Sequence, residues 1–191
     1  MTRQRLEAFS DGVIAILITI MVLELHMPPG ADLASLKPVV PGLLAYVLSF
    51  IFLGIYWNNH HHTFHLVDRI NGAMLWANLH VLFWLSLIPV TTAWVGAHPT
   101  AALPSAIYGA VLLMAGVAYF ILIRVIIAFQ GEHSRLAAAI GADIKGIGSV
   151  LLYASAIPLA FVRPWIAQAI YVIVALIWLV PDPRIESRIE R

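Results

Sequence analysis

Residues 70–123 form an uninterrupted stretch that contains no Asp, Glu, Lys or Arg side chain. Residues 38–67, 146–162 and 164–181 are equally free of these four residue types. A helix needs about 20 apolar residues to cross the hydrocarbon core of a bilayer, which is about 30 Å thick. The charge-free stretches therefore predict a chain that passes repeatedly through a membrane as α-helices.

The composition excludes most other classes of protein. Charged residues make up 11% of the 191-residue chain and hydrophobic residues 61%, whereas the surface of a soluble domain is about 25–35% charged. The formal net charge of +1 provides no basic surface for nucleic acid. The absence of cysteine excludes disulfides and thiolate metal sites. No nucleophile–base pair, phosphate-binding loop or zinc signature is present, so we expect neither an enzyme nor a cofactor.

The charge-free stretches divide into helices at short loops rich in Gly and Pro. We predict an all-α membrane protein with a single domain, residues 1–191, and a kink at each of the two prolines inside spans, Pro89 and Pro158. The six predicted spans lie near residues 8–27, 39–58, 74–95, 103–127, 146–162 and 165–181.

Basic residues in the loops predict the orientation, because cytoplasmic loops carry an excess of Lys and Arg. Only Lys37 and Arg163 fall on one side of the predicted helices. We therefore expect a multi-pass protein of the cell membrane with both termini in the cytoplasm. A cleaved signal peptide over residues 1–34 is disfavoured by its acidic residues and the lack of a clear cleavage site. The basic residues on the cytoplasmic side are Arg3, Arg5, Arg69, Arg135, Lys145, Arg184, Arg188 and Arg191.

The first predicted span is the unusual one. Only twelve uncharged residues separate Asp11 from Glu24, which is about 18 Å of helix, so the helix must carry Ser10, Asp11 and Glu24 into or close to the membrane. Ionisable groups there usually face a bundle interior or a water-filled path. Capping of the helix by Ser10 or Asp11 is the alternative. We favour a buried polar cluster at the cytoplasmic end of the span.

An aliphatic stripe runs along the same helix. At about 100° per residue, Ile16, Ile20 and Leu23 fall within about 60° of one another, and Thr19 lies at the edge of the stripe. Taken alone, such a stripe is more often a lipid-facing or core surface than a pore lining. Periodicity does not distinguish these possibilities.

Two motifs carry a resemblance to a known family. The segment from Arg5 to Asp11, RLEAFSD, resembles the R-x-x-x-F-S-D signature that opens the first helix of the endolysosomal potassium channel family. The segment from Trp57 to Phe64, WNNHHHTF, is similar to the W-x-x-H-H-x-x-F stretch of that family. The third span, from Asn78 onward, also resembles the family. The chain is therefore identified as a single-repeat prokaryotic member.

The resemblance implies a homotetramer in which the first helix of each subunit lines a central pore. The family lacks the carbonyl-lined T-V-G-Y-G filter of ordinary potassium channels, as does this sequence. The family's filter isoleucine corresponds to Ile16, its further hydrophobic constrictions to Ile20 and Leu23, and its hydroxyl layer to Thr19. The implied function is a passive channel with a modest preference for potassium ions.

We further expect a hydrogen-bonded network that holds this helix against the second and third spans, because buried polar groups need partners. A metal site at His60–His62 and His65 is disfavoured, because Asp68 is the only nearby carboxylate. The alternative functions are a proton-coupled secondary transporter that uses Asp11 or Glu24, and a membrane scaffold that does not conduct. The expected signature and network residues are Arg5, Phe9, Ser10, Asp11, His60, His61 and Asn78.

Overall fold

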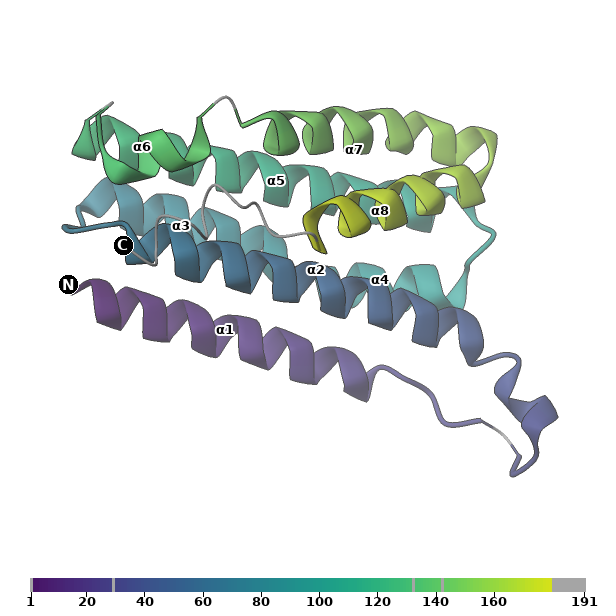
Figure 1. Ribbon diagram of the computed structural model, residues 1–191. Coiled ribbons are helices and arrows are strands. Elements are labelled where there is room, and N and C mark those ends of the chain that lie inside the picture. Colours follow the sequence, from purple (N-terminus) through teal and green to yellow (C-terminus); the bar gives the residue numbers. More distant parts are fainter. Residues whose placement is uncertain (1, 29, 132, 142, 180–191) are drawn as a thin grey trace.

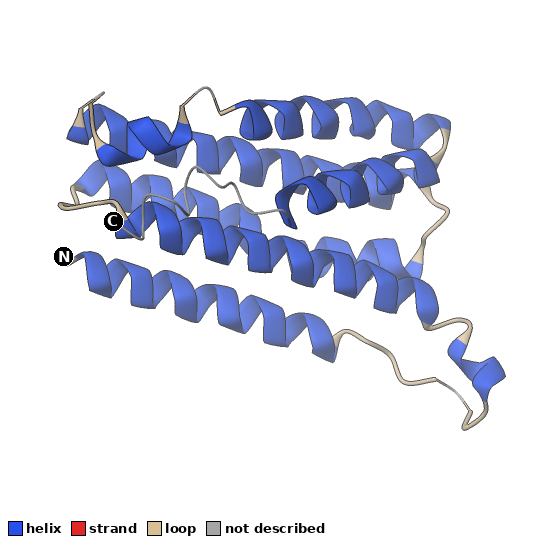
Figure 2. Cartoon of the chain, in the orientation of Figure 1, coloured by secondary structure: helices blue, strands red, loops and turns tan. Residues whose placement is uncertain are grey.

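The chain is a bundle of helices that run roughly parallel to one another (Figure 1). A computed structural model describes residues 2–28, 30–131, 133–141 and 143–179, and in these residues all regular structure is helical (Figure 2). The elements are α1 (Arg3–Leu23), the 3-10 helix η1 (Leu33–Leu36), α2 (Val40–His65), α3 (Gly72–Ser86), α4 (Ile88–Ala97), α5 (Ala102–Gln130), α6 (Arg135–Ile140), α7 (Ile144–Val162) and α8 (Pro164–Leu179).

The longest helix, α5, lies at the centre of the packing. It contacts α3, α4, α7 and α8, and its buried residues include Leu112, Leu122 and Ile126. In contrast, α1 lies at one edge of the bundle beside α2, and α7 lies at the opposite edge (Figure 1). α1 contacts α2, α3 and α4, and its other side is not covered by any other described residue.

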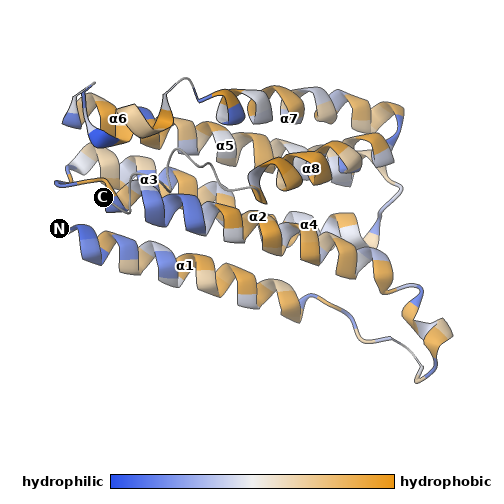
Figure 3. Ribbon diagram, in the orientation of Figure 1, coloured by the Kyte–Doolittle hydropathy of each residue, from blue (hydrophilic) through white to orange (hydrophobic). Residues whose placement is uncertain are grey.

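Among the described residues, five helical segments are long and apolar enough to cross a membrane, when α3 and α4 are counted as one segment, Gly72–Ala97. Apolar residues predominate along most of their length (Figure 3). The sixth predicted span corresponds to α8, whose 16 residues measure about 24 Å. The predicted end of that span at residue 181 and the basic residues Arg184, Arg188 and Arg191 lie outside the described residues.

Several predicted boundaries differ from the structure, among them the start of α1, which lies at Arg3 rather than near residue 8. The helix α1 ends at Leu23, four residues before the predicted end, because the backbone N–H of Glu24 turns back to the carbonyls of the last turn. The helix α2 continues to His65, seven residues beyond its predicted end, because Thr63 and Phe64 are buried in the core. The short helix α6 lies in a predicted loop, and Ser134 caps it by accepting a hydrogen bond from the N–H of Ala137.

The third predicted span is broken rather than continuous. The helix α3 ends at Ser86, and α4 begins two residues later with Pro89 in its first turn. Proline has no N–H and cannot continue the hydrogen-bond ladder. In the first turn of α4 the hydroxyls of Thr91 and Thr92 both donate to the carbonyl of Ile88, at 3.1 and 2.7 Å. Pro158, also predicted to kink its span, lies inside the continuous helix α7.

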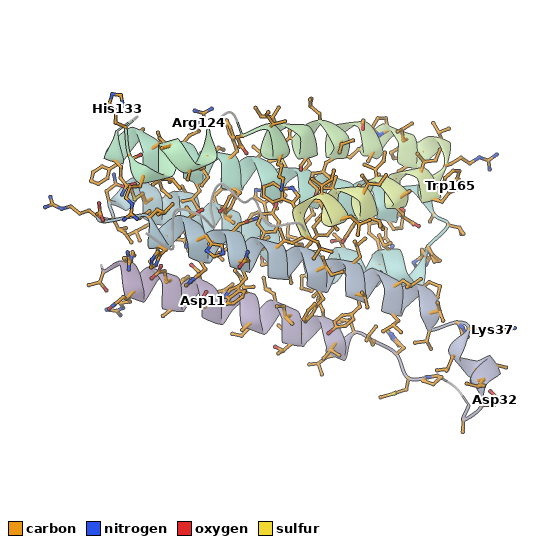
Figure 4. All side chains as sticks on the ribbon, viewed as in Figure 1. Asp11, Asp32, Lys37, Arg124, His133 and Trp165 are labelled. Atoms are coloured by element: carbon orange, nitrogen blue, oxygen red, sulfur yellow. The ribbon has the colours of Figure 1, made fainter. Side chains whose placement is uncertain are left out.

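The two ends of the bundle differ in charge. Arg124 and His133 lie near the end that carries the start of α1, whereas Asp32 and Lys37 lie beyond the other end (Figure 4). Arg3 binds the carbonyl of Val67 and therefore belongs to the first end. This is the end to which the sequence assigns most of its basic residues.

Candidate functional site

The helix α1 has two contrasting faces. One face is packed against the neighbouring helices, and its residues recur every three or four positions, which is the spacing of one helical face. The opposite face carries the aliphatic stripe, with Ile16 56% exposed, Ile20 42% exposed and Leu23 81% exposed. The described part of the chain therefore leaves an apolar surface of α1 uncovered. The buried residues of α1 are Leu6, Ser10, Ile14, Leu17 and Met21.

Thr19 lies on the exposed side of α1, close to the stripe. Its hydroxyl donates to the carbonyl of Ile16 at 2.8 Å, one turn earlier in the same helix. Because the hydroxyl proton is engaged with the backbone, the lone pairs of the oxygen remain available as acceptors. An oxygen in this state is suited to contact a cation.

A chain of hydrogen bonds joins α1 to α2 and α3. The Ser10 hydroxyl donates to the carbonyl of Leu6 at 3.0 Å and accepts from Asn78 Nδ2 at 3.0 Å. Asn78 Oδ1 lies 2.8 Å from His60 Nε2. Because the amide nitrogen is used by Ser10, the amide oxygen accepts and His60 donates, which assigns the proton to Nε2. His60, Asn78 and Ser10 are all buried, so the chain lies in the protein interior.

Asp11 attaches α1 to α2 by a separate contact. Trp57 Nε1 donates to Asp11 Oδ1 at 3.0 Å, and Asp11 lies in the first half of α1 (Figure 4). The capping alternative does not hold, because α1 begins at Arg3 and both Ser10 and Asp11 lie well inside the helix. Consecutive residues thus reach two different helices, Ser10 towards α3 and Asp11 towards α2.

A third contact lies at the start of α1. Arg3 Nη1 donates to the carbonyls of His65 and Val67, each at 3.3 Å, and the guanidinium lies 3.7 Å from the carboxylate of Glu7. A cation is favoured at the carboxyl end of a helix, where carbonyls lack partners. Arg3 therefore joins the start of α1 to the end of α2.

The predicted network is only partly assembled in this way. Ser10, Asn78 and His60 are brought together, and Asp11 joins α2 through Trp57 rather than through a histidine. Arg5, Phe9 and His61 are exposed; the ring of His61 stacks on Trp57 with centroids 6.4 Å apart. These three residues belong to neither the hydrogen-bond chain nor the Asp11 contact.

Sequence reasoning missed Arg3 and Trp57. The signal for Trp57 was its position one turn before His60 on α2, although the indole reaches Asp11 on α1 and the imidazole reaches Asn78 on α3. The signal for Arg3 was weaker, because the sequence does not show that the end of α2 lies beside the start of α1.

The remaining candidates from the sequence are not part of a shared site. In the described part of the chain, no three His, Asp or Glu side chains are grouped so that they could hold a metal ion. Glu24 lies exposed at the end of α1, well away along the helix from Asp11. The two carboxylates considered for a coupled transporter are therefore in different places.

The contact between Trp57 and Asp11 gives a testable prediction. Trp57→Phe keeps the ring but removes the N–H donor, and we expect it to lower the free energy of unfolding by about 1 kcal/mol, because the pair is partly exposed. Thermal unfolding in detergent measures this, with Trp76→Phe, a 75% exposed tryptophan, as the matched control. An unchanged unfolding temperature in Trp57→Phe, or an equal loss in Trp76→Phe, would contradict an anchoring role.

The chain is similar to proteins of one family throughout its length. The family model described as endosomal/lysosomal potassium channel TMEM175 matches residues 5–89, which contain α2, α3 and all but the first two residues of α1. A potassium channel from a Chryseobacterium species is 54% identical over 190 residues, covering 100% of this chain and 99% of that protein. The human endosomal/lysosomal proton channel TMEM175 is 32% identical over 102 residues, which cover 47% of this chain and 20% of that protein.

A solved structure supports the same assignment. The crystal structure of a lysosomal potassium-selective channel TMEM175 homologue from Chamaesiphon minutus superposes with a TM-score of 0.82 at 28% sequence identity, covering 93% of this chain and 96% of that chain. The resemblance found in the sequence is thereby confirmed. These relatives are ion channels, which favours neither an enzyme nor a coupled transporter. The chain belongs to the TMEM175 family of endosomal/lysosomal potassium channels.

Proposed function

We propose that this protein is a passive potassium channel, a homotetramer in which four α1 helices surround a central pore. Each chain contributes one six-helix domain, with both termini in the cytoplasm of a cell-membrane protein. The proposal rests on the contrast between the two faces of α1. Polar contacts fix one face to α2 and α3, whereas the exposed face of its own subunit is aliphatic. Four copies around one axis would cover that face.

Ion selection in this arrangement depends on dehydration. Side chains of Ile16, Ile20 and Leu23 from four subunits form successive apolar constrictions narrower than a hydrated cation. An ion must lose part of its water to pass, and apolar constrictions also close by dewetting. Potassium releases its water more readily than sodium does. Because no cage of carbonyls replaces that water, the preference for potassium is modest, with the Thr19 hydroxyls supplying part of the replacement.

Proton conduction is the second candidate function, because the vertebrate relatives are named proton channels. Liposomes loaded with potassium and a pH-sensitive dye distinguish the two. A potassium channel drives proton entry only when an added protonophore completes the circuit, whereas a proton channel does so only when an added potassium ionophore such as valinomycin completes it. Potassium efflux without any coupled solute separates both from a transporter, and absence of flux would show a scaffold.

The position of the pore is tested by cysteine substitution, for which the natural chain offers a background without cysteine. Leu23→Cys places a thiol at the end of the aliphatic stripe. We expect a charged, water-soluble methanethiosulfonate reagent to modify this thiol and stop most of the potassium flux, because a charge and added bulk would occupy the pore. The flux through liposomes is measured before and after the reagent.

The matched control is Val90→Cys, a 68% exposed position on α4 that the proposal assigns to the outer surface. Its flux should be unaffected by the same reagent. If Leu23→Cys is modified without loss of flux, or if the purified protein has the mass of a monomer, the proposed pore is wrong.

A further inference from the structure

A cavity outside the candidate ion pathway lies between two connections of the bundle. Its volume is about 480 Å³, and it is bordered by the α2–α3 connection and by described residues from the end of α5 to the first turn of α6. It lies at the end of the bundle where Figure 4 labels His133. Sites for small ligands usually have volumes of about 300–1,000 Å³, so the space suffices for a compact polar group.

Two arginines line this cavity, Arg69 from the α2–α3 connection and Arg135 from the first turn of α6. Among the described residues, neither guanidinium forms an ion pair with a carboxylate. Arginine presents a planar set of N–H donors that matches the oxygens of a phosphate. His133 also lines the cavity and adds a further nitrogen. The described cationic groups are thus suited to a phosphate-bearing ligand.

The same cavity also contains acceptors that a simple anion would not satisfy. Asp68 lines it with a carboxylate. Gln130, another lining residue, has a side-chain Oε1 that is buried and lacks a hydrogen-bond partner within the described part of the chain. A buried acceptor without a partner is costly. A primary ammonium carries three N–H donors, and so it would complement both Gln130 and Asp68.

Apolar residues complete the lining. Leu66 and Phe129 border the cavity, and Phe129 is 49% exposed at the end of the long helix α5. The cavity therefore adjoins the apolar length of the bundle on one side and charged connections on the other. Basic pockets between membrane helices are suited to lipid headgroups for this reason.

We propose that this cavity binds the phosphoethanolamine headgroup of a membrane phospholipid. Arg69 and Arg135 hold the phosphate, Gln130 and Asp68 accept hydrogen bonds from the ammonium, and the acyl chains leave past Phe129. The bound lipid joins the α2–α3 connection to the start of α6, which are distant in the sequence. The site does not include α1, so its occupancy is measured independently of conduction.

Native mass spectrometry of the full chain in detergent tests the lipid class. Phosphatidylethanolamine, phosphatidylcholine and phosphatidylglycerol with identical acyl chains are titrated separately. We expect phosphatidylethanolamine to bind at least about tenfold more tightly than the other two. Phosphatidylcholine has no N–H for Gln130 and Asp68, and phosphatidylglycerol has no ammonium. Equal binding of the three lipids would overturn the proposal.

Variants of the lining residues test the position. Arg69→Gln and Arg135→Gln should each weaken binding of phosphatidylethanolamine by about tenfold, because each removes a charge-assisted hydrogen bond to phosphate. Arg163→Gln is the matched control, an exposed arginine in the α7–α8 connection, and should bind as the natural chain does. Thermal unfolding checks that all three variants are folded.

Titration with soluble phosphoethanolamine shows whether the cavity takes its headgroup from a membrane lipid or from the free compound in solution. We expect it to bind much more weakly than the lipid, because it lacks acyl chains to pack along the bundle. If it binds as tightly as the lipid, the assignment to a membrane lipid is overturned. If binding of the lipid is the same in Arg69→Gln, Arg135→Gln and the control, the assignment to this cavity is overturned.

Discussion

Replacing Ile16 by asparagine is expected to bring the ratio of potassium to sodium permeability to about one, with larger currents for both ions. The side chain of Ile16 is 56% exposed on the uncovered face of α1. An amide at this position brings water into the proposed constriction. Ions then pass with more of their hydration shell, and the difference in dehydration cost between potassium and sodium no longer matters.

Two variants separate the effect of polarity from other causes. Ile16→Val keeps the position apolar and should preserve the permeability ratio. Val22→Asn introduces the same amide into the same helix, at a 46% exposed position about 120° away from Ile16 around the axis, and should also preserve it. Reversal potentials with potassium on one side and sodium on the other give the ratio. An unchanged ratio in Ile16→Asn would show that this residue does not select ions.

Replacing Asn78 by leucine is expected to lower the free energy of unfolding by about 2–3 kcal/mol. Asn78 is fully buried and connects His60 on α2 with Ser10 on α1. Leucine has a similar size, but it leaves the His60 N–H without an acceptor and removes one hydrogen bond from Ser10. The loss weakens the attachment of α1 to the rest of the subunit, so we also expect less assembled protein after purification.

The matched control is Asn58→Leu, the same substitution at an exposed asparagine two residues before His60 on α2. It should unfold at the same temperature as the natural chain. The double variant with Ser10→Ala should lose less stability than the sum of the single variants, because both remove the same contact. Thermal unfolding in detergent measures all four proteins. Additive losses would mean that Ser10 and Asn78 act separately.

The sequence predicted the membrane helices because charge-free stretches have a direct physical meaning in a bilayer. It also placed a disruption near Pro89, where the structure has the break between α3 and α4. The partners of the polar residues were harder to predict. The helix α3 is apolar on nearly all sides, so its sequence does not show which side faces α1, and the contact of Asn78 with Ser10 depends on that rotation.

The sequence also did not show which residues of α1 are buried and which are exposed. The buried Ile14 and the exposed Ile16 are the same residue type two positions apart, and hydropathy does not distinguish them. The same holds for Arg3 and Arg5. The sequence does not show which of the two contacts a neighbouring helix, because it does not show where α2 ends relative to α1. In the structure it is Arg3 that makes this contact, because its guanidinium donates to the carbonyls of His65 and Val67.

The long connection between α1 and α2 has a consequence for how the subunit holds together. Residues 24–39 separate these helices, with only the short η1 between them, whereas α7 and α8 meet at Arg163. A tether between two binding partners gives each an effective concentration at the other, and this concentration falls as the tether lengthens. The helix α1 is thus comparable to a peptide ligand tethered to its own receptor, and the contacts of Arg3, Ser10 and Asp11 hold it in place.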